Sequence, residues 1–391
     1  MENFPRTSED LDVIVAKLQQ QAHDEHKARI SPSKLNDPHR HALVQAINNV
    51  LSTEIALDTY AQIIDGLPTA EVGFDRRSHH IWDGHAVDEH VELCPGAMEK
   101  AREFCPKWHL DMLAFNPQLI RDFRNAAPGT KVFATRLIEL VAVAIHQFGA
   151  LLYQLDFRVH QGDVDAAVTA IEPRPDYIEP ELWGTIIPPP TIFYHIAYQC
   201  HDIYPEGVAD MVGYWVEDRI FGGVVVFDRP AEQGADGNRN PNPPNIYLHP
   251  CRDRVTRRIT QLSDEQQQAL VDFFTKTGPE PPSSSPLPII VGYKNRRRVD
   301  PEVAIVNLTI CRDVWERKPP TLDEYFISTR RPRSSLDYPE TLAFMILANG
   351  KAGNKLPEKL KDKLRSGELD DELGPDKKRL DLDKLLNERK S

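Results

Sequence analysis

Residues 222–228 read GGVVVFD, and this short stretch indicates the fold class. Three valines and a phenylalanine between a glycine pair and an aspartate are typical of a strand that is buried on both faces. Residues 245–249, NIYLH, provide a partner strand after the loop that covers residues 230–244. The chain before this pair has a helical pattern, so the sequence predicts an α+β protein with a helical N-terminal half and a smaller mixed or antiparallel sheet.

Helical periodicity dominates the first 155 residues. Apolar side chains recur at helical spacing from Leu43 to Ile64, and a long apolar helix is expected from Lys131 to about Leu155. The apolar middle of that segment contains Glu139 and His146, so we predict a buried core helix and no membrane span. Further helices are expected over residues 84–93, 96–104, 117–126, 207–217 and 263–274, and extended segments over residues 191–198, 255–260 and 289–292.

A chain of 391 residues can bury a sizeable core and divides by pattern into three regions. Residues 1–172 are mainly helical, and residues 173–348 form the α+β region. Residues 349–391 are rich in charge and are expected to be a helical or disordered tail. No apolar segment follows Met1, and five cysteines at wide spacing form no paired framework, so a reducing cytoplasmic location is expected.

The net charge of −12 hides an asymmetry along the chain. Residues 1–249 hold 20 basic and 36 acidic side chains, whereas residues 250–335 hold 15 basic and 11 acidic ones. If folding gathers the basic clusters on one surface, that surface would attract a polyanion, but the same groups can instead pair with the acidic half. The candidate phosphate-binding residues are Arg252, Arg254, Arg296, Arg297 and Arg298.

Chemically capable side chains are concentrated between residues 76 and 109, which contain five of the fourteen histidines. Asp83 is a good N-cap and Pro95 a good stop, which favours a helix over residues 84–93. On that helix, spacings of three and four residues put a histidine and two carboxylates on one face, where they can act as acid, base or ligand. The candidate catalytic residues are His85, Asp88, Glu89 and Glu92.

Other sites find less support in the sequence. The spacing Cys94-x10-Cys105-x3-His109 lacks the two close ligand pairs of a structural zinc site, so neither a metal nor another cofactor is expected. Histidines in apolar company, such as His146 and His195, are expected to be hydrogen-bonded core residues. The chain has no Gly-x-Ser-x-Gly, Walker A or Gly-x-Gly-x-x-Gly motif, which disfavours serine hydrolases, P-loop NTPases and ordinary dinucleotide enzymes.

Residues 210 to 320 resemble a group of fungal proteins of about this length, many of which belong to secondary-metabolite gene clusters. The resemblance is carried, in the same order, by FGGVVVFDR (221–229), NIYLHP (245–250), ITQLSDEQ (259–266), PLPI (286–289), RVDP (298–301) and RDVWER (312–317).

The activity that this resemblance implies is arginine-containing cyclodipeptide synthesis, a natural-product reaction that uses arginyl-tRNA and a second aminoacyl-tRNA as partners. The family has an Asp-Asp-x-x-Glu motif, and residues 88–92, DEHVE, are its nearest match, with Glu89 at the second position. An activated aminoacyl ester needs no ATP site, in agreement with the absence of such a motif. Two alternatives stay open: a metal-assisted tailoring enzyme with His85, Asp88, His90 and Glu92 as ligands, and a non-catalytic adaptor or regulator.

Overall fold

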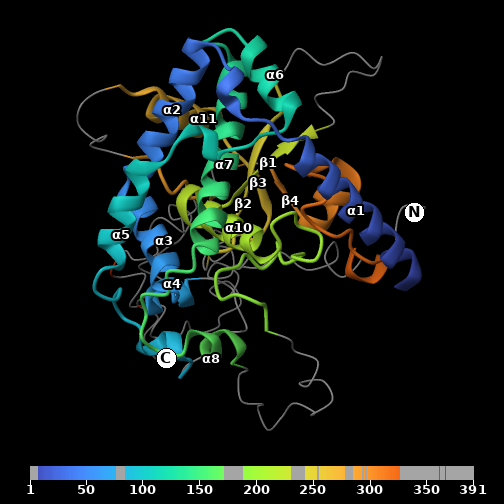
Figure 1. The fold of residues 1–391 in the computed structure, drawn as a ribbon. Coiled ribbons are helices and arrows are strands. Elements are labelled where there is room, and N and C mark those ends of the chain that lie inside the picture. Colours follow the sequence, from blue (N-terminus) through green and yellow to red (C-terminus); the bar gives the residue numbers. More distant parts are fainter. Residues whose placement is uncertain are drawn as a thin grey trace, which may run out of the picture.

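The computed structural model describes residues 8–75, 84–170, 188–229, 243–252, 255–277, 285–292, 295, 297–325, 361 and 366. These residues form the predicted α+β fold, in which helices surround an antiparallel sheet of five strands (Figure 1). The expected tail of residues 349–391 lies outside the described residues, except for residues 361 and 366.

The two stretches that indicated the fold class form the centre of the sheet. Its strand order is β4-β3-β2-β1-β5, and each neighbouring pair is antiparallel. The register of the central pair sets Val224 opposite His249 and Phe227 opposite Ile246. The strands are β1 (Val224–Asp228), β2 (Ile246–His249), β3 (Ile259–Gln261), β4 (Arg298–Val299) and β5 (Ile310–Cys311).

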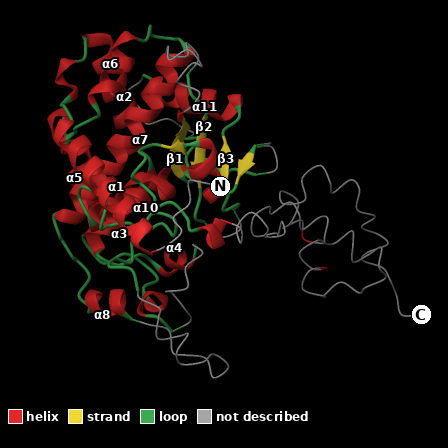
Figure 2. Cartoon of the chain, turned by 90° about the vertical axis from the view of Figure 1, so that its right-hand side faces the viewer, coloured by secondary structure: helices red, strands yellow, loops and turns green. Residues whose placement is uncertain are grey.

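Both faces of the sheet are buried, as the unbroken apolar run predicted. Successive side chains of a strand point to opposite faces. Val225 and Phe227 therefore join the main core with the helices, while Val224 and Val226 join a second, aromatic-rich core. In Figure 2 most of the helices lie to one side of the strands, with α11 above them.

Side-chain caps begin many of the helices. Asn36, Thr53, Thr130 and Ser263 each accept a hydrogen bond from a backbone N–H of the first turn. The α-helices are α1 (Ser8–Ala28), α2 (Asp37–Leu51), α3 (Glu54–Asp65), α4 (Ala70–Phe74), α5 (Ala97–Phe104), α6 (Pro117–Asn125), α7 (Lys131–Gln154), α8 (Val164–Thr169), α10 (Val208–Phe221), α11 (Asp264–Thr275) and α12 (Pro301–Val303). Shorter helices are η1 (Pro32–Lys34), η2 (Ala86–Glu89), η3 (Cys105–Lys107), η4 (Leu110–Met112) and the π-helix η6 (Ala304–Leu308).

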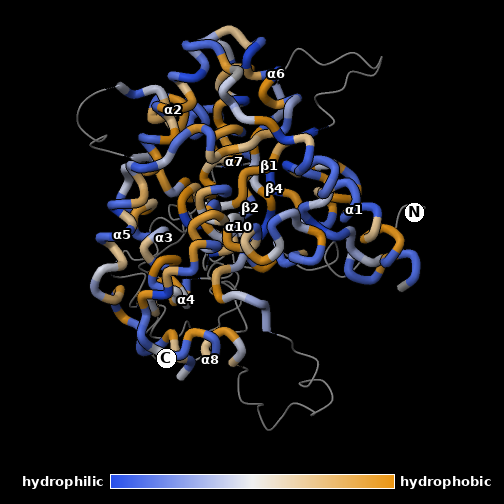
Figure 3. The backbone as a smooth tube through the Cα atoms, viewed as in Figure 1, coloured by the Kyte–Doolittle hydropathy of each residue, from blue (hydrophilic) through white to orange (hydrophobic). Residues whose placement is uncertain are grey.

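The long apolar helix α7 is the core helix that its sequence predicted. By length and composition it also qualifies as a membrane span, but 72% of its most apolar window is buried in this structure. It packs against α10 at short range, because a Cβ on Gly149 would lie 2.7 Å from a methyl carbon of Val216. The hydropathy colouring in Figure 3 shows this apolar centre around α7, α10, β1 and β2. One core includes side chains from both the helical and the α+β region.

Several element boundaries differ from the sequence prediction. The expected helix from Leu43 to Ile64 is two helices, because the Thr53 side chain caps the start of α3. Residues 191–198 form only a single bridge, between His195 and Tyr198, and residues 289–292 form no strand. Instead, the N–H of Ile289 donates to the carbonyl of Phe221 at the end of α10.

Candidate functional site

A charged pocket of about 260 Å³ opens where α1, α6, α7, α10, the end of β1 and the segment after β5 meet. Its size is close to the lower end of the range for small-molecule sites. Carboxylates and guanidinium groups both line it, so it suits a ligand that carries positive and negative groups. The charged residues besides histidine are Glu25, Arg29, Asp122, Arg136, Glu139, Asp210, Arg229, Arg312 and Asp313.

A buried histidine occupies the floor of this pocket between two carboxylates. His146 Nδ1 lies 2.8 Å from Glu217 Oε1, and His146 Nε2 lies 3.0 Å from Asp210 Oδ1. The Arg312 guanidinium donates to the same Glu217 oxygen at 2.6 Å. All four side chains are at least 90% buried, so water screens the interactions between their charges only weakly.

Helical spacing explains how these groups come together. Arg136, Glu139 and His146 lie three and then seven residues apart on α7, which places them on one side of the helix. Asp210 and Glu217 lie seven residues apart on α10, and both contact His146. Gly213 makes the close approach possible, because a Cβ there would lie 2.6 Å from the His146 ring.

A second charged cluster forms on the pocket wall, where two arginines bind a buried carboxylate. Glu139 accepts a hydrogen bond from Arg136 at 2.6 Å and another from Arg229 at 2.7 Å. Arg229 also donates to the carbonyl oxygen of Arg312 at 2.6 Å, which links the end of β1 to the segment after β5. These contacts fix the guanidinium groups as a rigid surface for an anionic or carbonyl group.

Electrostatics favour the charged forms of the groups in the histidine network. Burial by itself favours the neutral form of His146, but the hydrogen bonds that its ring donates to Asp210 and Glu217 outweigh burial and raise the pKa of His146. Burial likewise opposes ionisation of Glu217, yet the nearby Arg312 lowers the pKa of this carboxyl below its ordinary value. Burial opposes ionisation of Asp210 too, but the hydrogen bond and charge of His146 together with the N–H of Glu206 lower the pKa of this carboxyl. The shifts therefore favour an arrangement in which two cationic groups face two carboxylates.

The carboxyl group of Glu316 is buried next to this network, and its ionisation is hindered. Burial raises the pKa of Glu316 to about 7, although Arg312 opposes the shift. Its carboxylate accepts hydrogen bonds from the backbone N–H of Arg312 at 3.2 Å and of Asp313 at 3.3 Å, which orients the segment after β5. The protonation state of Glu316 is thus linked to the stability of the pocket wall.

We predict that this linkage makes stability fall as the pH rises from about 4.5 to about 7. A raised carboxyl pKa favours the folded state fully below the unfolded value of about 4.5, and this contribution is lost as the pH rises to about 7. Its maximum is on the order of 3 kcal/mol. Urea unfolding at pH 5, 6, 7 and 8 measures the loss, and Glu316→Gln should flatten it because glutamine does not ionise. An unchanged slope in that variant would show that Glu316 is not responsible.

The acidic stretch that the sequence favoured does not form the expected helix. A helix over residues 84–93 is wrong: only one 3-10 turn forms, η2, since the carbonyl of His90 accepts from Ala70 N–H instead of continuing the helix. His85 caps this turn by accepting from Val87 N–H, and its Nε2 lies 3.0 Å from the carbonyl oxygen of Ala167. The imidazole of His85 is therefore committed to backbone groups.

The carboxylates of this stretch are exposed. Asp88 accepts a hydrogen bond from the N–H of Gly84 at 3.1 Å, so it stabilises the local turn. Glu89 and Glu92 are exposed as well, and no residue of 84–92 lines the charged pocket. The proposed ligand set of His85, Asp88, His90 and Glu92 is not assembled, because only His90 points into a cluster of other metal-ligating groups.

The candidate phosphate-binding residues are dispersed within the described part of the chain. Arg252 is half-buried, and its guanidinium donates a hydrogen bond to the carbonyl oxygen of Arg219 on α10. Arg297 is exposed and lies over the ring of Tyr247, with 5.6 Å from its guanidinium carbon to the ring centre. Arg298 is half-buried on β4 beside it. Arg254 and Arg296 lie outside the described residues.

The sequence analysis missed the residues of the pocket, although a signal for them exists. His146 and His195 are indeed hydrogen-bonded core residues, and the Nε2 of His195 lies 3.0 Å from the carbonyl oxygen of His249. The signal is a stripe of ionisable residues on one side of an otherwise apolar helix, seen in α7 and again in α10. Two such helices bury their charges only by facing each other.

Comparison of this chain with protein-family models, with curated proteins and with solved structures finds no match. A function for the chain therefore rests on the chemistry of its own residues.

Proposed function

We propose that the protein is a tRNA-dependent cyclodipeptide synthase that joins arginine to a second amino acid, and that the reaction takes place in the charged pocket. The observation that carries the proposal is the buried His146–Asp210–Glu217–Arg312 network beside a pocket wall of both carboxylates and guanidinium groups. Arginyl-tRNA complements both kinds of group. Its guanidinium and ammonium suit the carboxylates, and its ester and phosphates suit the guanidinium groups.

The segment that carries the family resemblance supplies part of this pocket. Residues 221–229 end in Arg229, and residues 312–317 provide Arg312 and Asp313. Asp210 and Glu217 lie just before them on α10, within the span of residues 210 to 320. The resemblance and the pocket chemistry therefore point to the same part of the chain.

In the proposed reaction, carboxylates at the pocket rim receive the guanidinium of the arginyl group. Glu25, Asp122 and Asp313 are half-buried rim residues of suitable charge. The ammonium of the attacking amino acid must lose a proton before it reacts, and Asp210 is the carboxylate of the network that lines the pocket and can accept that proton. Two ester bonds break, two amide bonds form, and two tRNA molecules leave with free 3′ hydroxyls.

Positive charge for the tRNA backbone is proposed to come from both edges of the sheet. Arg29, Arg136 and Arg229 line the pocket near β5, whereas Arg298 belongs to β4 at the opposite edge. Arg297 precedes β4, and its guanidinium lies 4.0 Å from the carboxylate of Asp228 at the end of β1. Arginine contacts with phosphates at both edges would position the acceptor arm but would take no part in the reaction itself.

The direct test is product formation from purified components. The chain is incubated with arginyl-tRNA and each other aminoacyl-tRNA, and products are identified by mass spectrometry. We expect an arginine-bearing diketopiperazine with at least one partner, and none from free amino acids with ATP, because the ester is the activated form. Absence of product with every aminoacyl-tRNA, for a folded protein, would refute the synthase proposal.

A further inference from the structure

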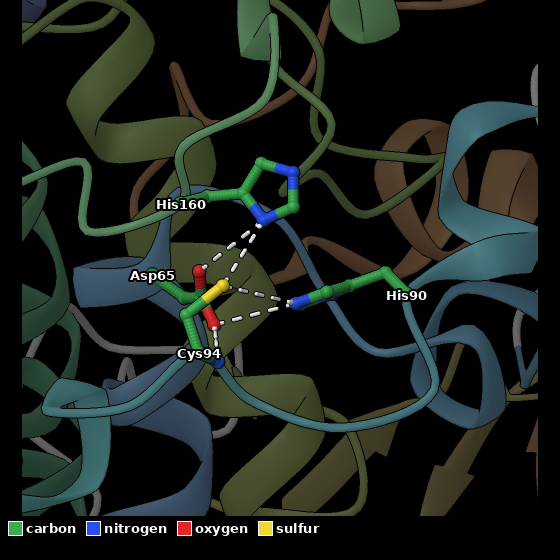
Figure 4. Close-up of side chains that lie close together, drawn as sticks. All are labelled: Asp65, His90, Cys94 and His160. Carbon is green, nitrogen blue, oxygen red and sulfur yellow. Dashed lines mark hydrogen bonds and ion pairs between the residues drawn. The ribbon is translucent and has the colours of Figure 1, made fainter.

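Four side chains that can bind a metal converge at a place separate from the charged pocket. Asp65 ends α3, His90 and Cys94 follow η2, and His160 lies in the loop after α7. Their ligand atoms all lie within 4.8 Å of one another. Figure 4 shows the four side chains pointing toward a common centre. Spacing along the sequence did not indicate this combination of ligands, because its members come from three segments far apart in the chain.

The distances between these atoms fit a small tetrahedral ion. Cys94 Sγ lies 3.3 Å from His160 Nδ1 and 4.0 Å from His90 Nε2. Asp65 Oδ2 lies 3.4 Å from His90 Nε2, and Asp65 Oδ1 lies 3.7 Å from His160 Nδ1. A tetrahedral zinc ion with bonds of about 2.0 to 2.3 Å separates its ligand atoms by about 3.3 to 3.8 Å. Only small side-chain movements are needed to close the site.

One carboxylate oxygen at the cluster has its hydrogen-bonding capacity unused. Asp65 is fully buried, and among the described residues its Oδ1 atom has no hydrogen-bond partner. Its Oδ2 atom, by contrast, accepts from the N–H of Cys94 at 2.6 Å. An unsatisfied buried carboxylate oxygen costs free energy, and a bound cation removes that cost.

Groups outside the cluster hold the ligands in place. His90 Nδ1 lies 2.9 Å from the carbonyl oxygen of Pro68, which leaves Nε2 directed at the cluster. The N–H of His160 donates to the carbonyl oxygen of Asp65 at 2.8 Å, so the loop is tied to the end of α3. Gly162 leaves room for the His160 ring, since a Cβ there would lie 2.5 Å from Nε2. Such support is characteristic of metal sites.

We infer that Asp65, His90, Cys94 and His160 form a structural zinc site. The mixed set of one thiolate, two imidazoles and one carboxylate suits zinc, whereas magnesium and calcium prefer oxygen ligands alone. Four protein ligands close the coordination sphere, which is typical of a structural site. Binding transfers the thiol proton of Cys94 to solvent as the sulfur–metal bond forms.

The consequence is a link between three segments of the fold. The ion would tie the end of α3 and the loop after α7 to the segment that contains η2 and the exposed Asp88, Glu89 and Glu92. This segment has little regular structure of its own, so the bonds from His90 and Cys94 to the metal would hold it in place. The inference is independent of the proposed function, since no ligand of the cluster lines the charged pocket.

The test is the metal content of the untagged full chain, purified without chelators. We expect about one zinc ion per chain. Cys94→Ser and the near-isosteric Asp65→Asn should each lower the affinity for added zinc at least 10-fold. Cobalt added to the metal-free chain should give a thiolate-to-metal absorption band that Cys94→Ser abolishes. Zinc should also raise the melting temperature of the wild type more than that of either variant, because it binds only the folded state.

Two controls separate this cluster from other ligand sets. Cys200 is a half-buried free thiol like Cys94, and His109 is the exposed histidine of the spacing noted in the sequence. Cys200→Ser and His109→Gln should keep the zinc, the cobalt band and the thermal shift. The inference is overturned if the wild type holds no zinc and takes none up, or if Cys94→Ser and Asp65→Asn bind zinc as tightly as the wild type.

Discussion

Glu217→Ala is expected to lower the free energy of unfolding by about 3 to 5 kcal/mol. The carboxylate of Glu217 is completely buried and receives hydrogen bonds from His146, from Arg312 and, at 3.2 Å, from the N–H of Val225. Its removal leaves the Arg312 cation in the interior with fewer opposite charges and leaves a cavity in addition. Urea unfolding followed by circular dichroism gives the change directly.

An exposed glutamate provides the matched control. Glu99 lies on the exposed side of α5, and Glu99→Ala should change stability by no more than about 0.5 kcal/mol. If Glu217→Ala were as mild as Glu99→Ala, the network around His146 would contribute nothing to folding, contrary to its burial and charge balance.

Asp210→Asn is expected to reduce diketopiperazine formation at least 100-fold while the protein stays folded. Asparagine keeps the shape of the side chain but carries no negative charge, so it cannot take up the ammonium proton or balance His146. Loss of a positioned acid or base typically costs 100-fold to 10,000-fold in rate. The measurement is the initial rate of product formation at saturating aminoacyl-tRNA, with thermal melting as the check on folding.

Two variants in the acidic stretch decide where the reaction takes place. Asp88 and Glu92 are exposed, so Asp88→Asn and Glu92→Gln should keep both stability and activity if the pocket is the site. If these two variants are inactive and Asp210→Asn is fully active, the motif of residues 88–92 is catalytic and the pocket assignment fails. The three variants are all near-isosteric, so the comparison is not confused by changes of volume.

The fold was predictable where local pattern and tertiary environment agree. The run from Val224 to Phe227 has no polar residue, so it could only become a strand covered on both faces. The capping box opened by Ser263 begins α11 at Asp264, one residue after the start of the helix expected over residues 263–274. The apolar helix ending near Leu155 likewise formed as α7, because its buried stripe fits between α2, α3 and α10.

Prediction failed where long-range contacts overrode a local pattern. Residues 84–93 had a cap, a stop and a helical spacing of polar groups, yet His90 bonds to Pro68 and Ala70 instead of continuing a helix. The side chains that were expected to share one helix face therefore separate. His85 turns to the carbonyl of Ala167, while Asp88 and Glu92 stay exposed.

The sequence by itself determined the class of fold, the position of the central strands and the burial of α7, because each follows from the periodicity of apolar side chains over short distances. Only the tertiary structure decided which ionisable groups meet. His146 finds Asp210 and Glu217 across a helix pair, and Asp65 finds His90, Cys94 and His160 across three segments. Spacing along one helix shows which residues share a face, but it carries no information on which face lies opposite.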